Sequence, residues 1–310
     1  MRSSFHDRKA EKRRLTPLDI PALVESRFAN GVSFECAVAG DSSNTLVILL
    51  HGFPDLWQGW HFQLPSLAAE FRVLAPNQRG YGRSDKPSEV SAYDIDQLAK
   101  DVVALADSEG ALRFHVVGHD WGGIVAWWVA ARYPERVKRL AVLNAPHPGA
   151  FFRYLLRSPT QLLRSWYVAL LQVPYLPELL LSANHFNLLY RSVVATSQPG
   201  VFDNSDRTYL LDGWTQSGAP TAMLNYYRAF FRRSTRSMQI RIVPPALILM
   251  SRSDPTEEPG LAEASLAFCD HGRIKWFEEA AHWLQREESS RLTHELLAFL
   301  TSSDVKSVVD

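Results

Sequence analysis

Cysteine and unbalanced charge are both scarce in this sequence of 310 residues. Its two cysteines, Cys36 and Cys269, are far apart in the chain, which excludes a disulfide scaffold or a cysteine zinc site and is typical of a reducing compartment. The 33 basic side chains equal the 33 acidic ones, so the sequence has no net basic charge of the kind that favours nucleic-acid binding. With 46% apolar residues, the chain is expected to be a soluble globular protein.

Long hydrophobic runs are also missing. The strongest candidate, residues 151–181, is interrupted by arginines and prolines, so it falls short of the roughly 20 apolar residues that a membrane helix needs. Basic residues crowd the first fourteen positions, but no apolar segment of a secretory signal follows them. We therefore interpret residues 1–25 as a basic tail and expect a cytoplasmic location with no membrane span.

Strand and helix patterns alternate along most of the chain. Alternating apolar residues at 32–38 predict a half-buried strand. Continuous apolar runs, typical of strands covered on both faces, occur at 45–50, 72–75, 114–117, 140–143, 246–250 and 274–277. Helical spacing lies between them, most clearly at Ile95, Leu98, Val102 and Leu105. This order predicts an α/β protein with a mostly parallel, doubly wound sheet.

One long segment breaks this alternation. Residues 151–233 are rich in Leu, Tyr, Trp and Arg at helical spacing and contain no strand run of comparable quality. We interpret residues 148–240 as a helical cap inserted between two parts of the core, 26–147 and 241–310. The second part is predicted to end in an amphipathic helix at 290–300.

The densest chemical signal is the sequence VVGHDWGG at 116–123. An apolar strand runs into small residues and then into a helical pattern, which predicts a sharp turn that exposes its central side chain, a nucleophile elbow. That central residue is Asp120. A carboxylate at this position predicts attack on an electrophilic sp³ carbon, which leaves an alkyl ester that water must cleave.

Two further residues follow later strands and complete a catalytic triad. His282 lies in the loop after the last predicted strand and is the candidate general base. Asp254 follows the strand at 246–250 and is the candidate acid that orients the imidazole. The backbone N–H groups of Phe53, in the sequence HGFP, and of Trp121 are the candidate oxyanion hole.

In this order and spacing, HGFPD at 51–55, RGYGRSD at 79–85, GHDWGG at 118–123 and AHW at 281–283 resemble the soluble-type epoxide hydrolases of the α/β-hydrolase fold. The resemblance runs from about Val32 to the final helix. It implies the α/β-hydrolase fold with a cap and no metal or cofactor. It also implies that two cap tyrosines, Tyr167 and Tyr227, hold the epoxide oxygen.

Several neighbouring residues are assigned structural positions instead. Tyr226 adjoins Tyr227, but one helical step turns a side chain by about 100 degrees, so only one of the two can face the site. We expect His51, His119 and His147 to brace loops. The chain departs from the family pattern at Asn77–Gln78, where an acidic and an apolar residue are common, and at Ser251, which replaces a frequent glycine.

The sequence thus predicts an enzyme that converts a small apolar or aromatic epoxide and water to a vicinal diol, acting as a monomer or homodimer. A haloalkane dehalogenase would share the aspartate nucleophile but needs two N–H donors for the halide. Trp121 could be one, whereas Phe53 stands where an asparagine would supply the other. A catalytically silent α/β-hydrolase-fold binding protein is the alternative of another class, although all three triad members are present.

Overall fold

The structure is a computed structural model that describes residues 22–232 and 240–302. Residues 1–21 of the predicted basic tail and 233–239 of the predicted cap lie outside the described residues. Within that part of the chain, eight strands form one sheet in the order β1-β2-β4-β3-β5-β6-β7-β8. The strands are β1 (Leu23–Ala29), β2 (Val32–Ala39), β3 (Leu46–Leu50), β4 (Arg72–Pro76), β5 (Phe114–His119), β6 (Val137–Leu143), β7 (Ala246–Ser251) and β8 (Gly272–Phe277).

The sheet is mostly parallel, as predicted. Strands β4, β3, β5, β6, β7 and β8 run parallel to one another, whereas β2 is antiparallel to both β1 and β4. Strand β1 was not predicted, and its residues 23–25 had been assigned to the basic tail, so the tail boundary at residue 25 is wrong. Asn30 and Gly31 form its turn to β2 with φ of 47° and 75°. Asn-Gly is a hairpin signal that the sequence analysis overlooked.

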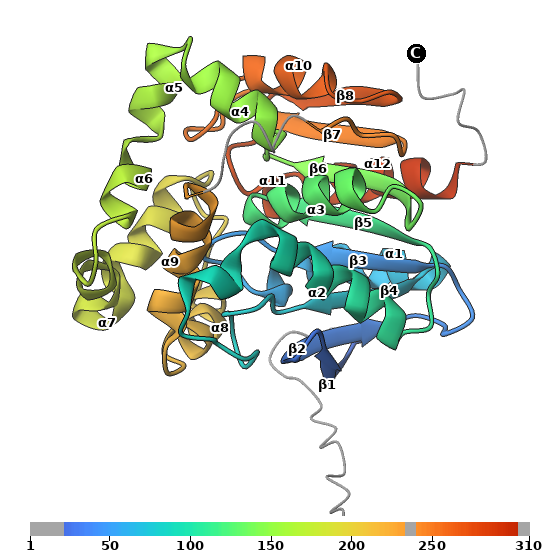
Figure 1. Ribbon diagram of the computed structural model, residues 1–310, viewed down its shortest axis with the longest axis horizontal. Helices are drawn as coiled ribbons and strands as arrows, with labels where there is room; N and C mark the ends of the chain where they lie inside the picture. Colours follow the sequence, from blue (N-terminus) through green and yellow to red (C-terminus); the bar gives the residue numbers. More distant parts are fainter. Residues whose placement is uncertain (1–21, 233–239, 303–310) are drawn as a thin grey trace, which may run out of the picture.

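Helices cover both faces of the sheet and one end of it (Figure 1). Helices α2 and α3 lie in front of the sheet in Figure 1, and α1 and α12 lie behind it. The core segments are η1 (Trp57–Trp60), α1 (Leu64–Glu70), η2 (Val90–Tyr93), α2 (Ile95–Ser108), α3 (Trp121–Arg132), α10 (Gly260–Leu266), α11 (Leu284–Glu287) and α12 (Ser289–Thr301). The predicted helix at 290–300 is thereby confirmed.

In the segment between β6 and β7, the described residues form helices joined by loops and contain no strand, as the sequence predicted. Its helices are α4 (Pro148–Leu155), α5 (Pro159–Arg164), α6 (Trp166–Leu171), α7 (Leu176–Ala195), α8 (Asn204–Trp214) and α9 (Ala219–Phe230). We call these helices the cap. They lie along the left side of the molecule in Figure 1. None of the described helices is long and apolar enough to span a membrane.

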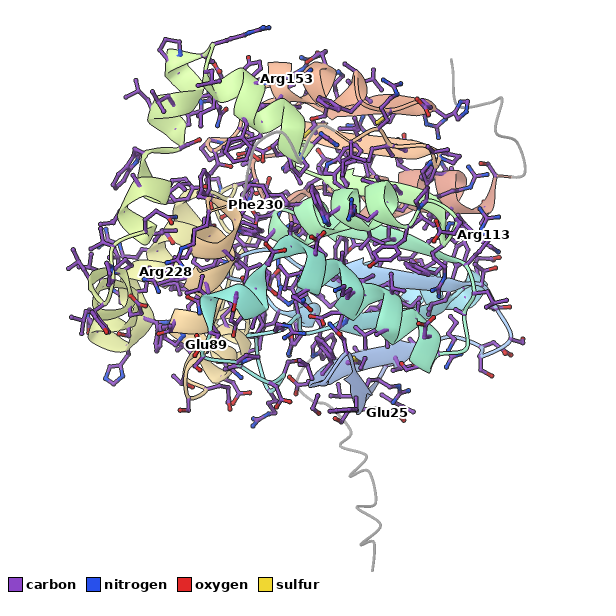
Figure 2. All side chains as sticks on the ribbon, in the orientation of Figure 1. Glu25, Glu89, Arg113, Arg153, Arg228 and Phe230 are labelled. Atoms are coloured by element: carbon purple, nitrogen blue, oxygen red, sulfur yellow. The ribbon has the colours of Figure 1, made fainter. Side chains whose placement is uncertain are left out.

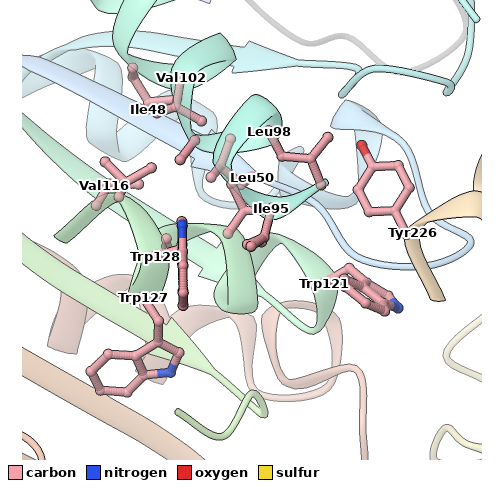
Figure 3. Close-up of a cluster of buried hydrophobic side chains, with 14 of the residues drawn as sticks. Ile48, Leu50, Ile95, Leu98, Val102, Val116, Trp121, Trp127, Trp128 and Tyr226 are labelled. Atoms are coloured by element: carbon pink, nitrogen blue, oxygen red, sulfur yellow. The ribbon is translucent and has the colours of Figure 1, made fainter. Parts of the chain in front are cut away.

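The alternation of side chains along buried strands builds two apolar layers. In β3, Ile48 and Leu50 point into the layer beneath α2 and α3, which Figure 3 shows. Val47 and Leu49 point into the opposite layer, with α1 and α12. All four side chains are fully buried, which explains why this strand reads as a continuous apolar run rather than an alternating one.

Buried ion pairs hold the cap together and attach it to the core. Arg228 of α9 donates to both carboxylate oxygens of Glu178 in α7, at 2.7 and 3.0 Å, and to the carbonyl of Leu171 in α6. Figure 2 labels Arg228 on the left of the molecule, among the side chains of the cap. Arg286 of α11 donates to Asp206 of α8 at 2.8 Å, which joins the core to the cap. Charge-assisted contacts of this kind fix the cap over the ends of the strands.

Candidate active site

Asp120 occupies the sharp turn between β5 and α3. Its φ of 49° and ψ of −122° lie outside the regions that L-residues usually adopt, so the turn is strained. Glycine is required on both sides of it. A Cβ at Gly118 would lie 2.2 Å from the carbonyl oxygen of Gly122, and a Cβ at Gly122 would lie 2.2 Å from that of Leu50. The sharp strand-to-helix turn predicted at Asp120 is therefore present, and Asp120 lines a cavity.

Two backbone donors face this carboxylate. The N–H of Phe53 donates to Oδ1 of Asp120 at 2.6 Å, and the N–H of Trp121 also hydrogen-bonds to the carboxylate. Phe53 follows β3, and Trp121 begins α3, where the helix dipole favours negative charge. The structure thus brings together the two groups that the sequence predicted as an oxyanion hole.

The other two members of the predicted triad are in contact. Nδ1 of His282 lies 2.8 Å from Oδ2 of Asp254, and Nε2 of His282 lies 3.9 Å from Oδ2 of Asp120. The residues follow β8, β7 and β5, and the carboxyl ends of these parallel strands meet at one edge of the sheet. The imidazole is therefore held on one side by Asp254 and directed on the other toward Asp120.

Burial and charge together set the ionisation of these groups. Burial disfavours the imidazolium, but the carboxylates of Asp254 and Asp120 outweigh it and raise the pKa of His282 to about 9. Burial raises the pKa of Asp120, an effect that His282 and the two backbone donors partly offset. Asp254 is buried too, yet its imidazolium partner and hydrogen bonds hold its pKa below the usual value. The two acidic neighbours thus favour the protonated form of the imidazole between them.

Sequence reasoning missed two polar residues that position the triad. Thr256 donates its backbone N–H and its hydroxyl to Oδ1 of Asp254, both at 2.7 Å. Asn144 follows β6 and donates to the carbonyls of Ala281 and His282, both at 2.9 Å. Its position at the carboxyl end of a parallel strand was the available signal. Ser251, the departure from the family pattern, donates its N–H to Asn144 at 2.8 Å and so belongs to this brace.

The histidines expected to be structural do brace loops. His51 contacts the carbonyl of Gly52 through Nδ1 and accepts from the N–H of Gln78 through Nε2, both at 3.0 Å. Burial lowers its pKa to about 4, so its ring is neutral. His119 lies 2.8 Å from the carbonyl of His282, and His147 accepts from the N–H of Gly149 at 3.1 Å.

Asn77 and Gln78, the other departure from the family pattern, also make structural contacts. Asn77 accepts from the N–H of Trp57 at 2.8 Å, and the Gln78 side chain donates to the carbonyl of His51 at 2.6 Å. Both contacts hold the loop that carries Phe53.

The cap brings Tyr167 and Tyr227 over the same site. The Tyr227 ring lies 4.8 Å from Trp121 and 6.4 Å from Tyr167 between ring centroids. Burial and the nearby charge of Asp120 raise the pKa of both phenols, so both remain protonated donors. Tyr226 instead donates to the carbonyl of Arg79 at 2.8 Å and packs near Trp121 in the core (Figure 3). Of the two adjacent tyrosines, Tyr227 lies at the site and Tyr226 packs in the core.

Two cavities meet at these groups. A cavity of about 390 Å³ has a largely leucine-rich wall that includes Leu170, Leu171, Leu181 and Leu189. A cavity of about 60 Å³ is bounded by Phe151, Phe230, Phe231, Gln161, Ser165 and Glu257. Asp120, Tyr167 and Tyr227 line both cavities. A ligand that touches Asp120 can therefore extend in two directions from it.

Comparisons with known proteins identify the family of the chain. The α/β hydrolase fold family model matches residues 45–289. The chain is 35% identical to the AB hydrolase superfamily protein YfhM of Bacillus subtilis, over 87% of this chain and 95% of that protein. It is 34% identical to epoxide hydrolase 4 of Homo sapiens, over 87% of this chain and 76% of that protein.

A solved structure shares the whole architecture. The Bacillus megaterium epoxide hydrolase in complex with an inhibitor superposes with a TM-score of 0.80 at 27% identity, covering 89% of this chain and all of that one. The matched region contains both parts of the sheet and the cap between them. The chain belongs to the α/β-hydrolase family, in the group that includes the epoxide hydrolases.

Proposed function

We propose that this protein is an epoxide hydrolase that adds water to an epoxide and releases a vicinal diol. The observation that carries the proposal is the placement of the Asp120 carboxylate between two backbone donors and two protonated cap tyrosines. Relatives and structural neighbours named as epoxide hydrolases support the same reaction. The large apolar cavity favours an apolar or aromatic substituent on the epoxide.

In the first step, Asp120 attacks one oxirane carbon through Oδ2, because Oδ1 is held by the N–H of Phe53. The carbon–oxygen bond of the ring breaks, and its electron pair goes to the epoxide oxygen. Tyr167 and Tyr227 bind that oxygen and supply its proton, a task that a phenol performs without placing another negative charge beside Asp120. The product of this step is an alkyl ester on Asp120.

In the second step, water attacks the carbonyl carbon of the ester. His282 accepts the proton from water through Nε2, while Asp254 holds its Nδ1. The N–H groups of Phe53 and Trp121 stabilise the negative oxygen of the tetrahedral intermediate. The acyl C–O bond then breaks while the imidazolium of His282 returns its proton to the leaving oxygen, which releases the diol and restores the Asp120 carboxylate.

The charges explain how one histidine can be an imidazolium in the resting enzyme and a base afterwards. The Asp120 carboxylate is one of the charges that raise the pKa of His282 to about 9. Ester formation removes this charge, so the pKa of His282 falls and the ring can give up its proton, which replaces the one that a tyrosine gave to the epoxide oxygen. The first chemical step thereby prepares the base for the second.

Labelled water tests the ester route. With enzyme in excess over styrene oxide in H₂¹⁸O, the diol from one turnover should carry unlabelled oxygen, because the added oxygen comes from Asp120. Direct ¹⁸O incorporation in that first turnover would contradict the route. Asp120→Asn is the control and should give no diol.

Parallel assays separate the alternatives. Styrene oxide and 1-bromobutane are offered to the wild type, and diol and bromide are measured. Diol without bromide supports the proposal, whereas bromide alone would indicate the dehalogenase. The Trp121 side chain hydrogen-bonds to Tyr227, which occupies the donor that a halide would need. Neither product, even with other epoxides, would favour the silent binding protein.

A further inference from the structure

Glu257 is a buried carboxyl group that the reaction above does not use. It lies in the loop between β7 and α10, with 9% of its surface exposed, and its side chain lines the small cavity together with Asp120 and Tyr167. Its Oε2 is buried and has no hydrogen-bond partner among the described residues. An unsatisfied buried polar atom destabilises a fold, so a group of this kind at a cavity wall points to a ligand.

The polar neighbours of Glu257 already have partners. Gln161 donates to the carbonyl of Thr256 at 2.9 Å and to Ser165 at 3.1 Å, and it accepts from the N–H of Glu258 at 2.8 Å. The hydroxyl of Thr256 donates to Asp254 at 2.7 Å. Glu257 thus retains hydrogen-bonding capacity that the wall around it does not use.

The charges near Glu257 do not compensate for the burial of its carboxyl group. Burial, reinforced by the negative charges of Asp254 and Asp120, raises its pKa well above the usual value, although His282 opposes this. Burial thus favours the protonated form of the group, which offers one O–H donor beside acceptor oxygens. A neutral partner that both donates and accepts, such as an alcohol, matches it better than an ion.

The sizes of the two cavities indicate how a substrate would be oriented at Asp120. The small cavity holds about 60 Å³, enough for a few non-hydrogen atoms, since a water molecule occupies about 30 Å³ in the liquid. The other cavity holds about 390 Å³ and has a largely apolar wall. An epoxide seated at Asp120 would place a large apolar group on one side and a short substituent beside Glu257 on the other.

We propose that Glu257 is a specificity-determining residue that binds a hydroxyl group on the short substituent of the substrate. The substrate class is then a 2,3-epoxy alcohol whose distal carbon bears a large apolar or aromatic group. The apolar group occupies the large cavity, and the hydroxymethyl group occupies the small one. This inference rests on the proposed epoxide hydrolase function and adds the substrate class to it.

The test compares two substrates of nearly the same shape. In trans-3-phenylglycidol the oxirane carries a CH₂OH group, and in trans-1-phenyl-1,2-epoxybutane it carries CH₂CH₃. We expect wild-type kcat/KM to be about tenfold higher for the alcohol, the factor that about 1.4 kcal/mol from one hydrogen bond provides. Glu257→Leu should abolish this preference by slowing the alcohol alone, and Glu257→Gln should keep part of it.

Glu258→Leu is the matched control. The neighbouring Glu258 accepts a hydrogen bond from Ser158 and is not part of the small cavity wall, so its replacement should leave the preference unchanged. Thermal unfolding of each variant checks that it folds, and Glu257→Gln provides a near-isosteric second variant.

Two results would overturn the inference while leaving the proposed function intact. One is a wild type that hydrolyses both substrates without preference. The other is a Glu257→Leu variant that slows both substrates equally, which would place Glu257 in the chemistry instead. A wild type that converts neither these substrates nor styrene oxide contradicts the proposed function itself, and the inference with it.

Discussion

The sheet side and the cap side of the site are built differently. On the sheet side, Asp120, Asp254 and His282 have short contacts to backbone donors or to each other, at 2.6–2.8 Å. On the cap side, the phenols of Tyr167 and Tyr227 line both cavities and remain protonated donors. Glu257 lies in the core loop after β7, but its Oε2 also has no hydrogen-bond partner among the described residues. The triad is fixed before substrate binds, whereas the cap tyrosines and Glu257 keep hydrogen-bonding capacity for a ligand.

This difference follows the two proposed steps. Ester hydrolysis uses the same groups whatever the substrate, so its donors and base gain from being fixed in advance. Ring opening requires groups that bind an epoxide of particular shape, and their hydrogen bonds must be free until it arrives. Each prediction below removes a group from one side and asks whether only the corresponding step is affected.

Replacing the base should have the largest effect. In His282→Gln, ring opening continues but ester hydrolysis loses its proton acceptor, so turnover should fall by about 10⁴-fold. Intact-protein mass spectrometry after addition of styrene oxide should show the mass of one substrate on the protein. Asp120→Asn should show no such adduct, and an adduct located on another residue would contradict the proposed nucleophile.

Removing the hydroxyls on the cap side should slow the other step. Tyr167→Phe and Tyr227→Phe should each lower the rate of ester formation by about 10²-fold, the usual size of a general-acid contribution. Single-turnover kinetics would show slow alkylation with ester hydrolysis unchanged. The matched control is Tyr226→Phe, which loses only the hydrogen bond to Arg79 and should keep its activity. Equal losses at positions 226 and 227 would mean that the cap tyrosines are structural.

A positioning residue on the sheet side should have a smaller effect. Thr256→Val keeps the shape of the side chain but removes the hydroxyl that donates to Asp254 at 2.7 Å. Loss of one hydrogen bond to a charged group costs about 1.5–3 kcal/mol, so ester hydrolysis should slow by about tenfold or more. Alkylation should be unaffected, and its unchanged rate distinguishes positioning from general loss of structure. Thr301→Val, on the exposed end of α12, is the control.

The charge of Asp120 should be visible in the titration of His282. Asp120→Asn removes one carboxylate that raises the pKa of His282, so this pKa should fall below about 9. The imidazole NMR shifts of the variant, followed against pH, measure it. In the wild type, kcat should fall as the pH drops through the pKa of His282 in the ester, because a protonated ring cannot accept a proton. An unchanged pKa in the variant would contradict the proposed coupling.

Much of this site could be predicted because its candidate catalytic side chains follow directly after predicted strands. The apolar runs predict the strands of the sheet. Because these strands are parallel, their carboxyl ends bring Asp120, Asp254 and His282 to one edge although the three residues are far apart in sequence. The prediction failed at β1, where polar residues on an edge strand give a weaker apolar pattern than the central strands.

Residues whose importance comes from a partner were also missed. Thr256 and Asn144 are ordinary polar residues until the fold places Asp254 and the His282 loop beside them. Glu257 is defined by what surrounds it: its burial and its lack of a partner come from α5, α6 and α9, which are distant in sequence. Such properties depend on three-dimensional packing, and a linear pattern carries no record of them.

The smallest predicted effect is a gain in stability when the buried carboxyl group of Glu257 is removed. Glu257→Leu replaces a buried carboxyl whose Oε2 has no partner with an apolar side chain among Phe151, Phe230 and Phe231. The free energy of unfolding should rise by about 1 kcal/mol, since the unsatisfied group no longer has to be desolvated. Urea unfolding with an unchanged m-value measures this gain. Glu178→Leu, which breaks the ion pair with Arg228, should instead destabilise the protein. A loss of stability in Glu257→Leu would mean that the carboxyl group supports the fold and is not held for a ligand.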